Sequence, residues 1–380
     1  MPLPATLKKI NMRRFLEEMR YRGPSTRADL TRAVGVTPPT SSSIIADLME
    51  SGFVEEIPPN NGPKGRPGKL YQLAANSAYV LGATIDFGDC RISSAGLDGN
   101  PREASISTWK SADNYEGLLD QLTNQISSQI AQTPGDCRGI GIAVPGLLDG
   151  SSGRVALSPN LHFLDGKSLA DDLRARTDLP VICTQEEHAL CLAEQRIGHA
   201  KGMSDFAVID FSTGVGMGVV SGGHYVSGAS GFAGEIGHMT IVPGGELCGC
   251  GNRGCLETVS SDLIVQAELS RLAGRKVTLS QIDGVAPELC EQAALRSLPH
   301  LAIGVATVVN LFNPQAVFVH GKQFDLIPDA MARLNRAVQT HALRPSLEGL
   351  VVERAVGNKM YGAVSGSLDR LFASVGPLLS

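Results

Sequence analysis

One histidine and three cysteines stand close together in the second half of the chain and constrain its fold more than any other feature. They are His238, Cys248, Cys250 and Cys255, and glycines separate the cysteines. Three thiols and one imidazole at this spacing can complete a tetrahedron around zinc, because structural zinc sites are four-coordinate. The alternative is three free thiols that share a surface loop. Since no ligand position is left open, the spacing predicts one structural zinc ion per chain and no catalytic metal.

The length and the remaining composition predict a soluble, cytoplasmic protein of two or three packed units, because 380 residues exceed one ordinary core. Basic residues interrupt the first segment, so it lacks the apolar core of a signal peptide. The longest apolar stretch, residues 301–319, contains two asparagines and a proline, so we expect no membrane span. The other five cysteines lie scattered in apolar contexts and predict buried thiols: Cys90, Cys137, Cys183, Cys191 and Cys290.

The first 75 residues, here called the head, begin with three short helical patterns. Apolar residues at helical spacing predict helices over about 12–22, 26–35 and 38–52. Thr26 and Asp29 form a capping-box pattern at the start of the second helix. The short turn at residues 35–37 then predicts a helix-turn-helix, although a plain three-helix cap fits the same pattern. The third helix is expected to expose hydroxyl groups that can reach phosphates and base edges in a major groove, on Thr40, Ser41, Ser42 and Ser43.

Two alternating segments follow these helices and favour DNA binding over a structural cap. Residues 53–57 and 69–73 predict two strands, and the loop between them carries Lys64 and Arg66 among glycines and prolines. Such a loop is typical of a β-wing whose tip enters a minor groove. The head carries 11 Lys and Arg against 7 Asp and Glu, whereas the remaining chain carries 22 against 31. The sequence therefore predicts a winged helix-turn-helix DNA-binding domain over residues 1–75.

The body, residues 79–380, contains two similar openings about a hundred residues apart. Residues 80–86 and 206–210 both resemble a buried strand that runs into a tight turn and a second strand. This repetition predicts the duplicated lobes of an actin-like ATPase fold, with the second lobe opening near residue 200. Gly214, Gly216 and Gly218 would let backbone amides approach a phosphate closely, although a glycine-rich hairpin without a ligand looks the same.

Several motifs of the body resemble the ROK family (repressors, open reading frames and sugar kinases), and within it the NagC/Mlc/XylR-type sugar-responsive repressors. The resemblance covers nearly the whole chain and rests on the winged head, the glycine-rich turn, the cysteine group and residues 144–146, 157–161, 234–238 and 310–314. It implies a head joined to a two-lobed body of the sugar kinase, Hsp70 and actin type. It also implies that Asn160, Glu235, His238 and Glu257 line a sugar pocket between the lobes. Carboxylates accept hydrogen bonds from vicinal hydroxyls, and His238 would bind zinc through one ring nitrogen and the sugar through the other.

The rival hypothesis, an ATP-dependent sugar kinase, meets several departures from the kinase pattern of this family. Glu186 stands where the resemblance places an aspartate base, which displaces the carboxylate, although Glu186 can still contact the sugar. The first phosphate loop, with Asp86 and Gly88, has an acidic Asp89 where a glycine is usual. The second, with Gly214 and Gly216, begins at Ser212 in place of a glycine. We therefore expect no catalytic residues and degenerate phosphate loops.

The sequence and the resemblance together predict a regulator of carbohydrate genes that responds to a sugar or sugar phosphate. Its expected partner is double-stranded DNA, bound at a palindromic operator by a homodimer or homotetramer, with no membrane involved. Repression is favoured over activation. The identity of the sugar and the existence of a protein partner stay open.

Overall fold

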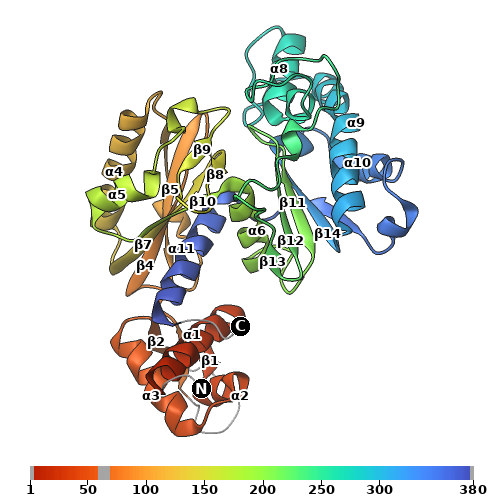
Figure 1. Cartoon of the computed structure of the whole chain (residues 1–380). Coiled ribbons are helices and arrows are strands. Elements are labelled where there is room, and N and C mark those ends of the chain that lie inside the picture. Colours follow the sequence, from red (N-terminus) through yellow and green to blue (C-terminus); the bar gives the residue numbers. More distant parts are fainter. Residues whose placement is uncertain (1–3, 59–68, 377–380) are drawn as a thin grey trace. The chain divides into compact units, whose positions relative to one another are not determined.

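The computed structural model describes residues 4–58 and 69–376, and Figure 1 shows their helices and strands. The chain forms two compact units. Unit 1 consists of residues 1–144, 168–184 and 360–380, and unit 2 consists of residues 145–167 and 185–359. Each unit is thus assembled from segments that lie far apart in the sequence.

The head consists of three helices and a small sheet. Its elements are α1 (Pro4–Arg22), α2 (Arg27–Val34), α3 (Pro38–Glu50), β1 (Ser25–Thr26), β2 (Val54–Ile57) and β3 (Leu70–Leu73). The predicted capping box is confirmed, because Thr26 Oγ1 accepts a hydrogen bond from the backbone N–H of Asp29 at 3.2 Å. α2 ends at Gly35 in the left-handed conformation, which turns the chain into α3. β2 pairs antiparallel with β3, so the expected hairpin follows the helix-turn-helix.

Lobe 1, the remainder of unit 1, is built on a five-stranded sheet of order β10-β7-β4-β5-β6. Its strands are β4 (Ala78–Thr84), β5 (Asp89–Gly96), β6 (Ser107–Lys110), β7 (Asp136–Val144) and β10 (Val181–Gln185). Its helices are α4 (Tyr115–Gln132), α5 (Leu169–Thr177) and most of α11 (Lys359–Val375). The central strand β4 pairs antiparallel with β5 and parallel with β7.

Lobe 2, which is unit 2, repeats this topology. Its main sheet has the order β13-β12-β11-β14-β15, formed by β11 (Phe206–Asp210), β12 (Gly216–Ser221), β13 (His224–Tyr225), β14 (Ala316–His320) and β15 (Val351–Arg354). β11 corresponds to β4, because it pairs antiparallel with the next strand and parallel with a strand that returns from far downstream. The duplication expected from residues 80–86 and 206–210 is therefore confirmed. A small ribbon of β8 (Leu147–Leu148) and β9 (Val155–Leu157) completes the strands of this unit.

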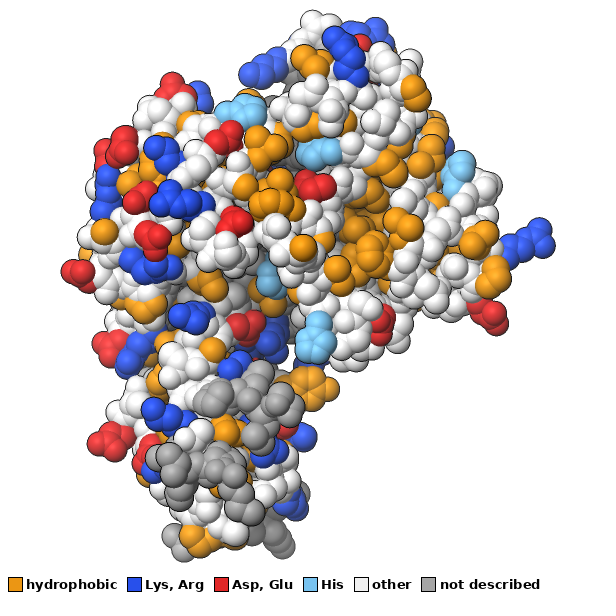
Figure 2. Space-filling model, in the orientation of Figure 1, with side chains coloured by type: hydrophobic (Ala, Val, Ile, Leu, Met, Phe, Trp, Pro, Cys, Tyr) orange, Lys and Arg blue, Asp and Glu red, His pale blue; other side chains and the backbone are white. Residues whose placement is uncertain are grey.

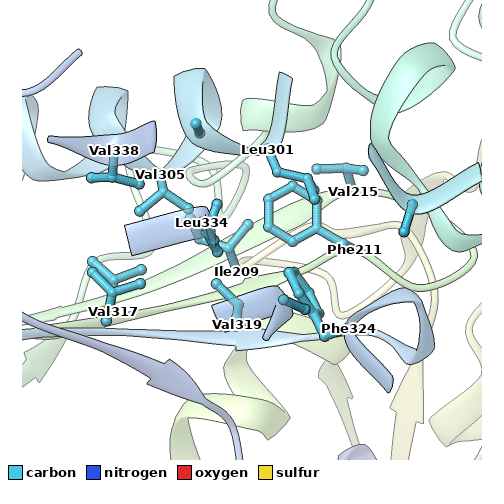
Figure 3. Packing of buried hydrophobic residues seen from close by; sticks show 14 of the residues in the cluster. Ile209, Phe211, Val215, Leu301, Val305, Val317, Val319, Phe324, Leu334 and Val338 are labelled. Carbon is cyan, nitrogen blue, oxygen red and sulfur yellow. The ribbon is translucent and has the colours of Figure 1, made fainter. Parts of the chain in front are cut away.

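The helices of lobe 2 are α6 (Glu186–Arg196), α7 (Glu257–Ser260), α8 (Asp262–Ala273), α9 (Pro287–Phe312) and α10 (Ala330–Val338). By length and composition, α9 alone among the described helices could cross a membrane. Figure 3 shows instead that Leu301 and Val305 of α9 pack with Ile209 and Val319 of the sheet. Their burial in this cluster identifies α9 as the core helix of lobe 2.

The head and lobe 1 share one hydrophobic core. Phe15, Leu30 and Leu48 of the head are buried in the same cluster as Val80 of β4 and Phe372 of α11. A head on a flexible tether would have a core of its own, whereas this head is packed against the lobe that follows it.

Candidate functional site

The exposed hydroxyl groups predicted at the start of α3 fall into different environments. Ser43 is exposed, while Thr40 and Ser42 are half-buried. Ser42 Oγ accepts a hydrogen bond from Arg27 Nη1 at 3.0 Å, which links α3 to α2. Ser41 lies in the interior with 0% exposure, so the prediction that this side chain is exposed and can contact DNA is wrong. Among the described residues its Oγ has no hydrogen-bond partner.

The tip of the wing, with Lys64 and Arg66, lies outside the described residues. At its base, Lys69 Nζ pairs with Glu56 Oε2 at 2.8 Å across the hairpin. Other cations of the head are exposed, among them Arg32, and Figure 2 shows Lys and Arg side chains on the visible face of this part of the molecule. Arg32 is itself paired with Asp29, so the predicted phosphate contacts depend on the cations of the wing tip.

The four predicted metal ligands come together in lobe 2. The ligand atoms of His238, Cys248, Cys250 and Cys255 all lie within 4.8 Å of one another. Cys250 Sγ is 3.8 Å from Cys255 Sγ, and Cys248 Sγ is 3.6 Å from His238 Nδ1. A zinc tetrahedron with metal–sulfur bonds of about 2.3 Å has sulfur–sulfur edges of about 3.8 Å, so the residues fit this metal. They form a group that could bind a metal ion.

The imidazole of His238 connects this group to an acidic side chain. Its Nδ1 faces Cys248, whereas its Nε2 lies 3.7 Å from Glu235 Oε2. Burial, followed by the like charges of Glu187 and Glu257, raises the pKa of Glu235 to about 8. A carboxyl group of this kind can donate as well as accept a hydrogen bond near neutral pH, which suits recognition of a hydroxyl group.

Glu257 lies between the cysteine group and the glycine-rich turn. Its Oε1 is 3.5 Å from Cys248 Sγ, and its Oε2 accepts a hydrogen bond from the backbone N–H of Val215 at 2.9 Å. A Cβ atom at Gly214 would come within 2.9 Å of Glu257 Oε2 and 3.5 Å of Asn160 Nδ2. Asn160, Glu257 and the turn are therefore neighbours, and the absence of a side chain at Gly214 permits their close approach.

Glu187 is an acidic side chain of this region that the sequence reasoning did not single out. Its Oε1 covers Gly216, where a Cβ atom would come within 2.1 Å. Burial raises the pKa of Glu187, with a further contribution from Asp210. In the sequence, its position directly after Glu186 was the only sign that Glu187 lies near the site. A glutamate at the start of a helix is usually explained by the helix dipole alone.

A buried group of charges lies where the second phosphate loop begins. Lys359 Nζ is 2.8 Å from both Glu186 Oε1 and Asp210 Oδ2, and 3.2 Å from Ser212 Oγ. His320 Nδ1 lies 2.8 Å from Asp210 Oδ1. Burial alone would raise the pKa of Asp210, but Lys359 and His320 hold it well below its usual range. Glu186 is thus half of a buried ion pair.

The segment predicted as the first phosphate loop lies in lobe 1, between β4 and β5. Asp86 accepts a hydrogen bond from the backbone N–H of Phe87 at 2.7 Å. Gly88 and Asp89 are exposed, and Cys90 is buried. The loop keeps its position after the central strand, and its exposed acidic residue would oppose a phosphate.

The chain is similar to several known proteins. The model of the ROK family matches residues 83–367. The xylose repressor of Bacillus subtilis (strain 168) is 30% identical over 346 residues, which cover 88% of each chain.

Two solved structures have the same fold. A ROK family transcriptional regulator, described as a homologue of the E. coli MLC protein, superposes with a TM-score of 0.76 at 23% identity, covering 97% of this chain and 98% of that one. A ROK family glucokinase from Streptomyces griseus, in complex with glucose and AMPPNP, gives a TM-score of 0.67 at 22% identity over 77% and 99% of the two chains. The regulator matches nearly the whole chain, head included, and both neighbours match the two-lobed body, so the expected fold is confirmed. The chain belongs to the ROK family.

Proposed function

We propose that this protein is a DNA-binding transcription regulator, acting as a repressor of carbohydrate genes, and that a sugar or sugar phosphate bound in lobe 2 controls it. The observation that carries the proposal is the shared core of a winged head and a lobe of sugar-kinase type. The similarity to a xylose repressor over 88% of the chain supports it. We also propose a cytoplasmic location, which the similarity to a bacterial repressor supports.

Lobe 2 supplies the proposed effector site. Asn160, Glu235, His238 and Glu257 would share the sugar hydroxyls, because carboxylates accept hydrogen bonds and the amide both donates and accepts them. Glu186 would act from the edge of the site through its pair with Lys359. The proximity of Asn160 and Glu257 to the glycine-rich turn supports this assignment.

We propose that His238, Cys248, Cys250 and Cys255 hold one zinc ion per chain. When bound, the ion would neutralise the thiolates and contribute its binding free energy to the folding of the loop. The loop residues themselves keep Glu257 against the turn through Val215. The metal would therefore shape the sugar site without taking part in chemistry.

The head supplies the proposed DNA contacts. Thr40, Ser42 and Ser43 of α3 would face the major groove, and Lys64 and Arg66 of the wing would reach phosphates or the minor groove. A homodimer or homotetramer would present two heads to the half-sites of a palindromic operator. The similarity to a ROK family transcriptional regulator along 97% of the chain supports the same use of the head.

A sugar kinase is the second candidate function. The likeness to a glucokinase solved with glucose and AMPPNP, together with the retained glycines of the turn, favours it. The pairing of Glu186 with Lys359 and the exposed Asp89 oppose it, because they occupy the base with a cation and place a negative charge at the phosphate loop.

A thermal-shift screen of sugars and sugar phosphates, with and without ATP, tests the proposal. Xylose is the first candidate because of the relative named above. We expect one sugar to raise the melting temperature without ATP and to change the mobility of an operator fragment in a gel shift. Stabilisation that requires ATP, with no effect on DNA binding, would support the kinase instead.

A further inference from the structure

One helix, α11, belongs to both units of the structure. Its first residue, Lys359, is the last residue of unit 2, and Met360 begins the final segment of unit 1. Most of its later residues are buried in unit 1, including Val364, Leu368 and Phe372. A continuous helix resists bending because each turn is hydrogen-bonded to the next. A displacement at Lys359 is therefore passed along α11.

Ion pairs hold the N-terminal end of α11 in place. The Lys359 side chain is 9% exposed and its ammonium contacts Glu186 of α6 and Asp210 of β11, each at 2.8 Å. Removing one partner of a buried pair leaves an uncompensated charge, which strongly destabilises the fold. Lys359 is therefore expected to follow its carboxylates when they move, because separation would take both counterions away from its buried ammonium.

These carboxylates belong to the elements that form the proposed sugar site. Asp210 ends β11 and receives hydrogen bonds from the backbone N–H and the hydroxyl of Ser212, at 3.0 and 2.8 Å. Three residues after Ser212, Val215 donates its backbone N–H to Glu257. The turn from Asp210 to Val215 thus has Lys359 bound at one end and Glu257 at the other.

The far end of α11 is fixed to the head. Asp369 forms an ion pair with Arg20 of α1, whose side chain is 4% exposed. The guanidinium of Arg20 lies 5.7 Å from the centre of the Phe372 ring, and Phe53 packs 6.5 Å from the same ring. Arg13 Nη1 donates a hydrogen bond to the carbonyl of Gly376, just beyond the helix, at 3.3 Å. The last turns of α11 are thus part of the core of the head.

We propose that α11 transmits the effector signal to the DNA-binding head, and that Lys359 is the positioning residue that links this helix to the sugar site. The proposal rests on the proposed function, since it names the route by which sugar alters DNA affinity. A sugar that contacts Glu257 moves or stiffens the glycine-rich turn, Asp210 carries this change to Lys359, and α11 carries it to α1. Coupling between two sites requires an element whose state both ligands change. α11 contacts residues next to the proposed sugar site and residues of the head.

The experiment measures operator affinity of the full-length protein with and without the sugar found in the screen, together with sugar affinity by calorimetry. Wild-type protein should show a change in operator affinity of about 5- to 150-fold, the usual range of coupling between two sites. Lys359→Met should still bind DNA, and should bind the sugar more weakly because its pair with Glu186 is lost, but at saturating sugar it should reduce this change to less than about twofold. Lys359→Arg, which keeps the charge, should retain most of it. Lys276→Met, at an exposed lysine of lobe 2, is the matched control and should behave as wild type. A folded Lys359→Met protein with wild-type coupling would overturn the proposal.

Two further measurements do not depend on the stability of Lys359→Met. Asp369→Asn weakens the attachment at the head and should reduce the coupling while leaving sugar affinity unchanged. Hydrogen exchange of the wild-type protein should show that sugar alters protection in residues 359–375 and 8–22. Unchanged exchange in both segments, in protein that responds to sugar, would exclude α11 as the route. A wild-type protein that binds neither sugar nor DNA would contradict the proposed function itself.

Discussion

Glu257 accepts a hydrogen bond at 2.9 Å from the backbone N–H of Val215, and this bond joins the cysteine loop to the glycine-rich turn. The other oxygen of the same carboxylate lies 3.5 Å from Cys248 Sγ. One side chain therefore contacts both a predicted metal ligand and the turn at the proposed sugar site. Changes in the cysteine group should reach the site through this carboxylate.

Replacing Cys250 with Ser should release the metal and abolish the response to sugar. Three remaining ligands bind zinc more weakly, and the loop that carries Glu257 loses the free energy of metal binding. Elemental analysis of protein purified without added metal should give one zinc per wild-type chain and far less for the variant. Cys290→Ser, at a buried thiol of the same lobe outside the group, should keep the metal. A metal-free wild-type protein that still responds to sugar would disprove the zinc assignment.

Replacing Glu257 with Gln should weaken sugar binding by roughly tenfold or more, because hydrogen bonds to charged groups contribute about 1.5–3 kcal/mol. The amide oxygen can still accept the hydrogen bond from Val215, so the turn should keep its shape. Calorimetric titration measures the change, and Glu246→Gln, at an exposed position of the same loop, serves as the control. Equal sugar affinity in the two variants would remove Glu257 from the site.

Replacing Arg66 with Ala should weaken DNA binding to all sequences and reduce its salt dependence. Loss of one phosphate contact lowers the slope of log affinity against log salt by about 0.9. Changes at Ser42 or Ser43 should instead alter sequence preference, because base contacts specify sequence. Fluorescence anisotropy over a range of salt concentrations separates the two effects, with Arg275→Ala in lobe 2 as the control. An Arg66→Ala protein with the DNA affinity and salt dependence of the wild type would refute this assignment.

Replacing Asp210 with Asn should destabilise the fold in a pH-dependent manner. The pKa of Asp210 is depressed in the folded protein, so its stabilising effect is present above the ordinary value of 3.8 and is lost as the pH falls below it. The wild-type protein should therefore exceed the variant in unfolding free energy at neutral pH, and the difference should shrink in acid. Urea denaturation between neutral pH and about pH 3.5 measures this difference. A difference that grows toward low pH would show that the carboxylate is not held ionised by Lys359 and His320.

Local patterns in the sequence were sufficient to predict the fold of the head and the repetition of the lobes. Thr26 and Asp29 lie three residues apart and identify the start of α2, because capping depends on neighbouring residues. The burial of Ser41 was also readable, since it precedes Ile44, Ile45 and Leu48 at the spacing of one helical face. The expectation of four exposed hydroxyl groups overlooked this periodicity.

The ion pairs of Lys359 could not be read from local patterns. Its partner Glu186 lies 173 residues earlier in the chain. A lysine at the start of a helix carries no local sign of such a pairing, and only the return of α11 past the end of β11 brings the charges together. The shared core of the head and lobe 1 could not be predicted for the same reason, because Phe372 and Phe15 come from opposite ends of the chain.

The last prediction concerns catalysis, where the two candidate functions differ most. We expect no phosphoryl transfer from ATP to any common hexose, pentose or N-acetylated sugar. Phosphoryl transfer depends on neutralising phosphate charge and on a base at the attacking hydroxyl. Here Asp89 adds negative charge at the first loop, and the Glu186 carboxylate is already paired with Lys359 at 2.8 Å.

A coupled assay of ADP release tests this expectation, with the Streptomyces griseus glucokinase as the positive control. Turnover in the usual kinase range of about 1–100 per second would favour the kinase. Glu186→Asp should not restore activity, because the shorter aspartate leaves Asp89 in place and leaves Lys359 beside Asp210. Activity gained by this single substitution would mean that the phosphate loops are competent, and that the length of one side chain alone separates this regulator from an enzyme.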